Sequence, residues 1–185
     1  MVPALAIVIM LAAAPVAEAG CIESWDGPTA CFDFFGSYPL RRLGAERDVS
    51  EQLVTEILGQ PLSRLSRLEP SHDYPGLDDE VIVTLKFNGV SVTLSRLVTE
   101  ERFQITRYEQ DELALSDRGC AIRSGSSREE VMKLLGCDEM SAEANVYTWH
   151  HQWCEDGLAY EEWATVTLRF RADRLAGVVW DYWGD

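Results

Sequence analysis

Two stretches of similar sequence, Ser127-Arg-Glu-Glu-Val-Met-Lys-Leu-Leu-Gly136 and Ser50-Glu-Gln-Leu-Val-Thr-Glu-Ile-Leu-Gly59, decide the fold that we expect. Each stretch places its apolar residues at helical spacing along one side. Each has a residue that can cap the start of a helix, Asp48 or Ser50 in one and Ser126 or Ser127 in the other. Each ends at a glycine that can adopt a left-handed conformation. The sequence therefore predicts two short amphipathic helices with equivalent starts and ends.

A second matched pair of segments follows the two helices. Val83-Thr-Leu-Lys-Phe87 and Val166-Thr-Leu-Arg-Phe170 differ only by lysine for arginine, and their offset is close to that of the helices. Both alternate apolar and polar residues, which is typical of a strand with one face on a core and the other in water. Asn88-Gly89 predicts a tight hairpin turn after the first of them. Each helix is thus expected to lead into an antiparallel meander.

These repeats predict an α+β protein of two tandem units, each a short helical element packed on an antiparallel β-meander. A chain of 185 residues is long enough for one compact domain or two small ones. The expected organisation is a signal peptide at 1–19, an N-terminal extension at 20–47, a first helix-plus-sheet repeat at 48–110, a linker at 111–119 and a second repeat at 120–185.

The N-terminal segment has the features of a secretory signal. Its apolar run, Ala4–Ala14, is shorter than the about 20 residues that span a bilayer, and Ala17-Glu18-Ala19 fits a signal-peptidase site. A competing interpretation is a lipoprotein junction at Gly20-Cys21, with Cys21 acylated. We expect a periplasmic or secreted protein cleaved after residue 19, and the alternative is a lipid-anchored envelope protein.

The overall charge restricts the class of partner. The chain carries 16 basic and 31 acidic residues, a net charge of −15. Such a surface repels nucleic acid and anionic headgroups. We therefore expect a protein partner, no nucleic acid, and contact with a membrane only if Cys21 is acylated.

The cysteines indicate disulfide bonds, because export places the chain in an oxidising compartment. The chain has five cysteines. Because this number is odd, one thiol must be free, acylated or paired between chains. If Cys21 is acylated, the other four can form two bridges; if it is not, Cys21 can pair with Cys31. The five are Cys21, Cys31, Cys120, Cys137 and Cys154.

The second repeat resembles a known family. Gly125–Gly136 is similar to the G-M-T-R-x-x-V-x-x-x-x-G helix of the beta-lactamase inhibitory protein, which also marks the small SmpA/OmlA (BamE) outer-membrane assembly lipoproteins. Val166–Phe170, continued through Leu175 and Trp180-Asp181, is similar to the closing hairpin of the inhibitory protein. The resemblance implies the tandem layout, and a role in binding other proteins.

The same resemblance implies one disulfide. The family places a bridge between a cysteine just after the helix and a cysteine further on, positions that Cys137 and Cys154 match. Closing a loop of this size is worth roughly 3 kcal/mol in the chain-entropy account.

Patterns that would support catalysis or metal binding are weak. His150 and His151 are adjacent on an expected strand and therefore point to opposite faces, which disfavours a metal site with Cys154. His72-Asp73 lies in a loop rich in proline and aspartate and is accompanied by no nucleophile motif. We therefore expect no enzyme activity, no metal and no cofactor.

The C-terminal strands supply the candidate binding residues. Trp180 and Trp183 fall on opposite faces of the last strand, so one of them is expected to leave aromatic area exposed, and exposed tryptophan is typical of protein interfaces. The expected function is an exported, non-enzymatic protein-binding module, inhibitor-like or an envelope-assembly factor; the alternative is a structural envelope lipoprotein anchored through Cys21. The expected binding face comprises Thr148, His150, Gln152, Thr165, Thr167, Arg169 and Trp183.

Overall fold

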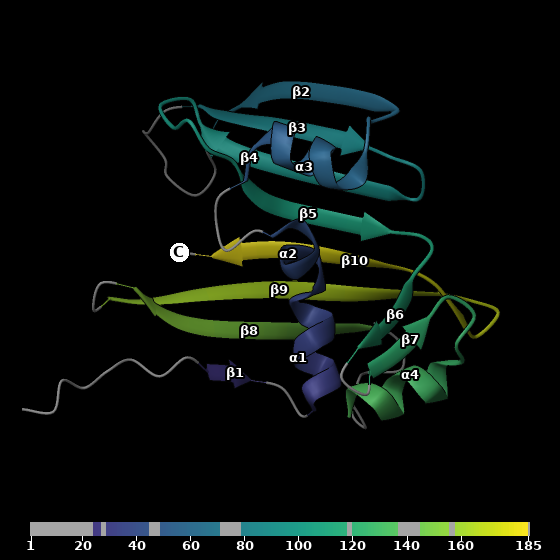
Figure 1. Ribbon diagram of the computed structural model, residues 1–185. Helices are drawn as coiled ribbons and strands as arrows, with labels where there is room; N and C mark the ends of the chain where they lie inside the picture. Colours follow the sequence, from purple (N-terminus) through teal and green to yellow (C-terminus); the bar gives the residue numbers. More distant parts are fainter. Residues whose placement is uncertain are drawn as a thin grey trace, which may run out of the picture.

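The computed structural model describes residues 24–26, 29–44, 49–70, 79–117, 120–136, 145–155 and 158–184 (Figure 1). The helices are α1 (Ala30–Gly36), α2 (Tyr38–Leu43), α3 (Glu51–Leu58) and α4 (Arg128–Leu135). The strands are β1 (Ser24–Asp26), β2 (Ser63–Glu69), β3 (Glu80–Lys86), β4 (Val90–Leu97), β5 (Gln104–Gln110), β6 (Ala114–Asp117), β7 (Cys120–Arg123), β8 (Val146–Glu155), β9 (Leu158–Arg171) and β10 (Arg174–Gly184).

Eight strands form one antiparallel sheet in the order β1-β8-β9-β10-β5-β4-β3-β2. The predicted α+β class with antiparallel strands is thereby confirmed. Two runs of neighbouring strands, β2 to β5 and β8 to β10, are joined edge to edge by the pairing of β10 with β5. β6 and β7 form a separate two-stranded sheet, so residues 114–117 of the expected linker belong to a strand.

The helices α3 and α4 begin where local capping signals predict. The Ser50 hydroxyl accepts a hydrogen bond from a backbone N–H in the first turn of α3. Ser127 and Glu130 form a capping box at α4. The Ser127 backbone N–H donates to the Glu130 carboxylate at 2.8 Å, which holds the pKa of that carboxyl below its ordinary value. Gly136 ends α4 in the left-handed conformation (φ 68°), whereas Gly59 ends α3 outside that region (φ 88°, ψ −168°).

The helices α1 and α2 cover one face of β8–β10 (Figure 1). The Trp180 indole Nε1 donates to the Phe35 carbonyl at 2.9 Å, and the Tyr182 hydroxyl donates to the Gly36 carbonyl at 3.0 Å. A Cβ at Gly36 would lie 2.1 Å from a ring carbon of the fully buried Trp149. The absence of a side chain at Gly36 therefore allows the helix to lie this close to the sheet.

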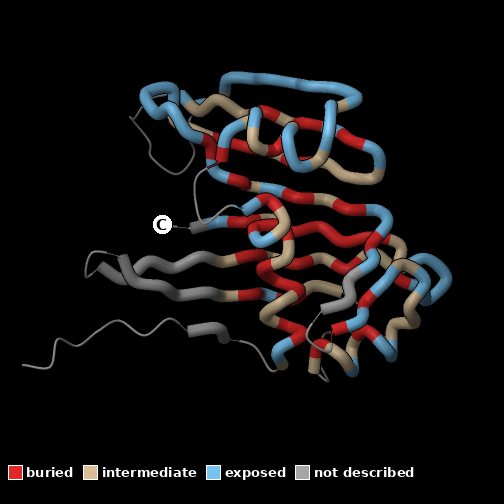
Figure 2. Tube along the Cα trace, in the orientation of Figure 1, coloured by how far each residue is buried: buried red, intermediate tan, exposed pale blue. Residues whose placement is uncertain are grey.

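The predicted alternation along β9 is confirmed. Ala164, Val166 and Leu168 are buried in the core, and Phe170 packs partly buried against it. The residues between them point to the opposite face and are only half-buried. Figure 2 shows buried segments along the part of the sheet that the helices cover. The core therefore lies between the helices and one face of the sheet.

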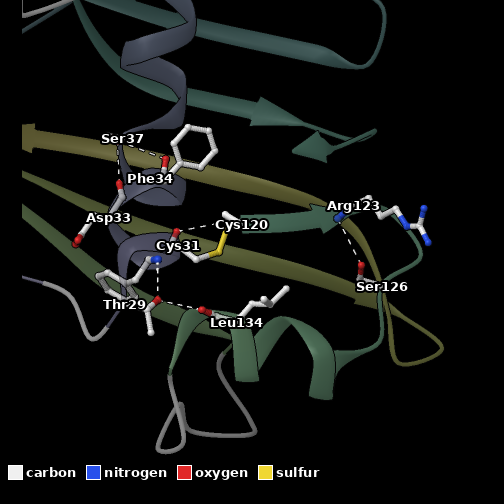
Figure 3. Close-up of a disulfide and its surroundings, with 10 residues drawn as sticks. Thr29, Cys31, Asp33, Phe34, Ser37, Cys120, Arg123, Ser126 and Leu134 are labelled. Atoms are coloured by element: carbon white, nitrogen blue, oxygen red, sulfur yellow. Dashed lines mark hydrogen bonds between the residues drawn. A yellow bond between two sulfur atoms is a disulfide. The ribbon is translucent and has the colours of Figure 1, made fainter. Parts of the chain in front are cut away.

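A disulfide joins Cys31 of α1 to Cys120 of β7, which are separated by 89 residues (Figure 3). The alternative pairing of Cys31 with Cys21 is therefore wrong. Cys31 pairs with Cys120 instead because α1 packs into the core and brings Cys31 next to β7. Thr29 caps α1, and its hydroxyl also donates to the Leu134 carbonyl of α4 at 3.0 Å. Residues 29–43 of the expected N-terminal extension are thus tied to the second half of the chain.

Four features named in the sequence fall outside the described residues: the signal segment 1–19, Cys21, His72-Asp73 and Cys137. Cys154 lies in β8, but its side chain also falls outside the description. The Cys137–Cys154 bridge stays a prediction for that reason. Within the described ranges, no helix has the length and apolar character needed to cross a membrane.

Candidate binding face

One face of the large sheet is left without a covering helix in the part of the chain that the structure describes (Figure 1). The strand register decides which residues share this face. Thr148 of β8 lies opposite Thr165 of β9, and Trp163 of β9 lies between His150 of β8 and Trp183 of β10. Side chains opposite one another in an antiparallel sheet point to the same side. These five residues therefore share the uncovered face. We call this face of β8, β9, β10 and β5, with the turn after β5, the binding face.

The structure brings six of the seven expected binding residues together on this face: Thr148, His150, Thr165, Thr167, Arg169 and Trp183. Thr148 and Trp183 are exposed, and the other four are half-buried. The seventh expected residue, Gln152 of β8, lies opposite Glu161 of β9 in the strand register. Its side chain is outside the described part of the structure.

Three rings stack across three strands at one end of the binding face. The His150 and Trp163 ring centroids lie 3.9 Å apart with planes at 21°, and those of Trp163 and Trp183 lie 5.6 Å apart at 12°. The Trp183 indole Nε1 donates to the Thr165 hydroxyl at 3.3 Å. Trp183 is 54% exposed, yet its indole is held by the contacts with Trp163 and Thr165. We call His150, Trp163 and Trp183 the aromatic stack.

Five alternating charges continue across the same face from the aromatic stack. Arg107 Nη1 lies 2.7 Å from Asp181, and its Nε lies 2.7 Å from Glu109. Arg169 then lies 3.5 Å from Glu109 and 2.8 Å from Asp111. These residues, which we call the charge ladder, link β9, β10, β5 and the turn after β5.

The charge ladder contributes little to stability. Burial lowers the pKa of the Arg107 guanidinium, but the Glu109 hydrogen bond and the charges of Asp181 and Glu109 outweigh it, so this pKa is raised. The side chains of the ladder are 31% to 71% exposed, and pairs of this kind contribute about 0–1 kcal/mol each. Their main effect is to hold charges of both signs in fixed positions next to the aromatic stack.

Gly177 makes the charge ladder sterically feasible. It lies opposite Arg169 in the register of β9 and β10. A Cβ at Gly177 would lie 2.9 Å from Arg169 Nη2 and 2.9 Å from the Gln110 backbone carbonyl. The guanidinium of Arg169 therefore reaches Glu109 and Asp111 by crossing β10 over the glycine.

We expect Gly177→Ala to lower the free energy of unfolding by about 1–3 kcal/mol, because the new methyl group meets backbone as well as the guanidinium. Arg169→Ala removes only exposed ion pairs and should cost about 1 kcal/mol or less. Denaturant titration of both single variants and the double variant measures this. The Gly177→Ala cost should persist in the Arg169→Ala background, since the Gln110 carbonyl remains. A cost that vanishes there would contradict the backbone clash.

Arg42 of α2 lies at the edge of a hollow of about 420 Å³, whose lining also includes Gln110, Asp111 and Glu112. Its guanidinium donates to the Tyr108 hydroxyl and to Gln110 Oε1, each at 2.9 Å. Burial raises the pKa of the Tyr108 phenol, against the opposing charge of Arg42. Arg42 thus fastens α2 to β5.

In the described ranges, no three His, Cys, Asp or Glu side chains come together as a metal-binding group.

Several residues of the binding face were missed by sequence reasoning. Trp163 could have been found, because it alternates with Thr165 and Thr167 along one strand. Arg107, Glu109 and Asp111 could not, since their position depends on the pairing of β5 with β10. That pairing joins strands far apart in sequence.

No protein-family model, curated protein or solved structure matches the chain. The resemblance to the inhibitory protein and the assembly lipoproteins thus stays an expectation from the helix and hairpin motifs.

Proposed function

We propose that the protein is an exported, non-enzymatic protein-binding module that binds its partner through the binding face. The observation that carries this proposal is Trp183, 54% exposed but fixed by Trp163 and Thr165. A rigid exposed tryptophan loses little conformational freedom on binding, and tryptophan is enriched among the residues that dominate binding energy. The flanking charge ladder would supply the polar surroundings that protein interfaces typically have.

The non-enzymatic part of the proposal rests on how the polar groups of the binding face are used. Arg107 and Arg169 are both engaged with carboxylates, and the Thr165 hydroxyl accepts from Trp183. Side chains that already form ion pairs and hydrogen bonds with one another can contact the surface of a partner protein, but they are poorly placed to react with a substrate. Inhibition of an enzyme and assistance in envelope assembly both remain within this class of function.

We also propose that the chain consists of two related units. α3 is followed by the meander β2–β5, and α4 is followed by β8–β10. Both helices have a serine cap and a glycine end. The pairing of β5 with β10 would then be the junction of the two units.

Export is supported by the Cys31–Cys120 disulfide, because such bonds persist mainly in oxidising compartments. The protein would then be periplasmic or secreted. The alternative, anchoring through Cys21, is decided by mass spectrometry of the N-terminal peptide of the native protein. An acylated Cys21 supports anchoring, and an N-terminus at Gly20 excludes it.

The test of binding is capture by the immobilised protein from the source organism's envelope and culture-fluid extracts. We expect one dominant partner, and we expect Trp183→Ala to weaken its affinity about tenfold or more. Val98→Ala is the matched control, because Val98 is an exposed apolar side chain (49%) directly after β4, outside the binding face. The control should bind as the unchanged protein does.

Two results would contradict the proposal. One is no capture above a reduced and unfolded sample of the same protein. The other is a partner that binds Trp183→Ala as tightly as the unchanged protein, which would place its contact away from the aromatic stack.

A further inference from the structure

The strand β2 ends the large sheet and pairs only with β3 among the described strands. Its pairing with β3 is continuous over all seven residues, without a bulge. Six of these residues are exposed. The outer edge of β2 therefore presents a straight row of backbone N–H and C=O groups.

Natural sheets normally protect such an edge with charged side chains, lysine above all, or with proline, a bulge or a covering segment. β2, with the sequence Ser-Arg-Leu-Ser-Arg-Leu-Glu, contains neither proline nor lysine, and its two arginines are paired with carboxylates of the same chain. Instead it carries exposed apolar side chains: Leu65 is 61% and Leu68 is 59% exposed, on opposite faces. Four of the six exposed large hydrophobic residues of the described chain gather at this end, namely Ile57, Leu62, Leu65 and Leu68.

The charges at this edge are already neutralised within the chain. Arg64 forms a two-point contact with Glu51 of α3, at 2.6 and 2.8 Å, and Arg67 lies 2.6 Å from Glu69. The hydrogen bond with Arg64 lowers the pKa of the Glu51 carboxyl. The edge is thus close to neutral, although the chain as a whole carries −15. Two acidic copies would meet the least repulsion here.

We propose that a second copy of this chain docks antiparallel against β2, so that the two sheets join into one. The strand is complementary to itself in this arrangement. With Ser66 opposite Ser66 of the second copy, Leu65 lies opposite Arg67 and Arg64 lies opposite Leu68. No like charges oppose one another, and each leucine packs on the aliphatic part of an arginine. The symmetry is two-fold and closed, so the assembly stops at a dimer.

The dimer is weak, and its response to salt has a definite sign. One strand pair is a small contact compared with the about 800 Å² per partner of a standard interface. Salt screens the repulsion between two copies of charge −15. Dimerisation therefore strengthens as salt is raised, whereas a dimer held by ion pairs would weaken.

Sedimentation velocity of the whole protein, from micromolar to near-millimolar concentration at low and moderate salt, tests this proposal. We expect the average mass to rise toward twice that of the monomer, more so at the higher salt. The double variant Leu65→Lys, Leu68→Lys should stay monomeric, and because both positions are exposed it should unfold as the unchanged protein does. Trp183→Ala removes a larger exposed side chain from the binding face and should dimerise normally.

A monomeric mass under all conditions overturns the proposal. The edge of β2 would then be available to pair with an extended segment of another protein. Dimerisation that survives the two lysines, or that is lost in Trp183→Ala, also overturns it. None of these results bears on capture by the binding face, so the two proposals fail independently.

Discussion

Replacing Trp180 with alanine is expected to lower the free energy of unfolding by about 3–5 kcal/mol, the largest effect of any substitution considered for this protein. Trp180 is fully buried at the centre of the core. Its ring lies 5.4 Å from Phe35, 5.9 Å from Tyr38 and 5.7 Å from Tyr108, measured between centroids. Truncation would leave a large cavity and would remove the donor to the Phe35 carbonyl.

The matched control for this prediction is Trp183→Ala, three residues further along β10. Trp183 lies on the opposite face and is 54% exposed, so its loss should cost about 1 kcal/mol or less. Denaturant titration at constant pH measures both variants. Similar losses in the two variants would contradict the assignment of one face to the core and the other to solvent.

Removing the Cys31–Cys120 disulfide should lower the free energy of unfolding by about 2–5 kcal/mol. The bridge closes a separation of 89 residues, for which loop-closure entropy alone amounts to about 4–5 kcal/mol. It also anchors α1, whose Phe32 and Phe35 pack into the core. Cutting the bridge increases the conformational entropy of the unfolded chain, which is the main source of the expected loss.

The measurement compares the unchanged protein with the Cys31→Ala, Cys120→Ala double variant under non-reducing conditions. Peptide mapping of the unchanged protein provides the control, and it should recover Cys31 linked to Cys120. The same map tests the expected Cys137–Cys154 bridge. Equal stability of the two proteins would show that the bridge constrains neither α1 nor the unfolded chain.

Features set by neighbouring residues were predictable from the sequence. Ser127 and Glu130 are three residues apart, and their capping box follows from that spacing. The alternation of Ala164, Val166 and Leu168 likewise fixed which face of β9 is buried. Both features depend on periodicity within one element.

Burial that depends on the position of an element in the fold was less predictable. Val54 and Ile57 both belong to the apolar stripe of α3, yet Val54 is fully buried and Ile57 is 41% exposed. α3 lies over the end of the sheet that contains β2 (Figure 1). A periodic pattern indicates a helix face but not how much of it is covered.

Contacts between distant segments lay beyond the reach of local patterns. The partner of Cys31 follows from the packing of α1 beside β7. The charge ladder requires β5 to pair with β10, and it also requires Gly177 to let Arg169 cross that strand. Neither the Cys31–Cys120 bridge nor the pairing of β5 with β10 is indicated by the residues that neighbour it in the sequence.

The central claim is that a partner protein contacts the binding face at Trp183. Hydroxyl-radical footprinting of the free protein and of its complex with the captured partner tests this claim most directly, because it reports the exposure of single side chains. We predict that Trp183 is oxidised in the free protein and protected in the complex, while the exposed Val98 stays equally reactive in both. A complex in which Trp183 remains as reactive as in the free protein would contradict the claim.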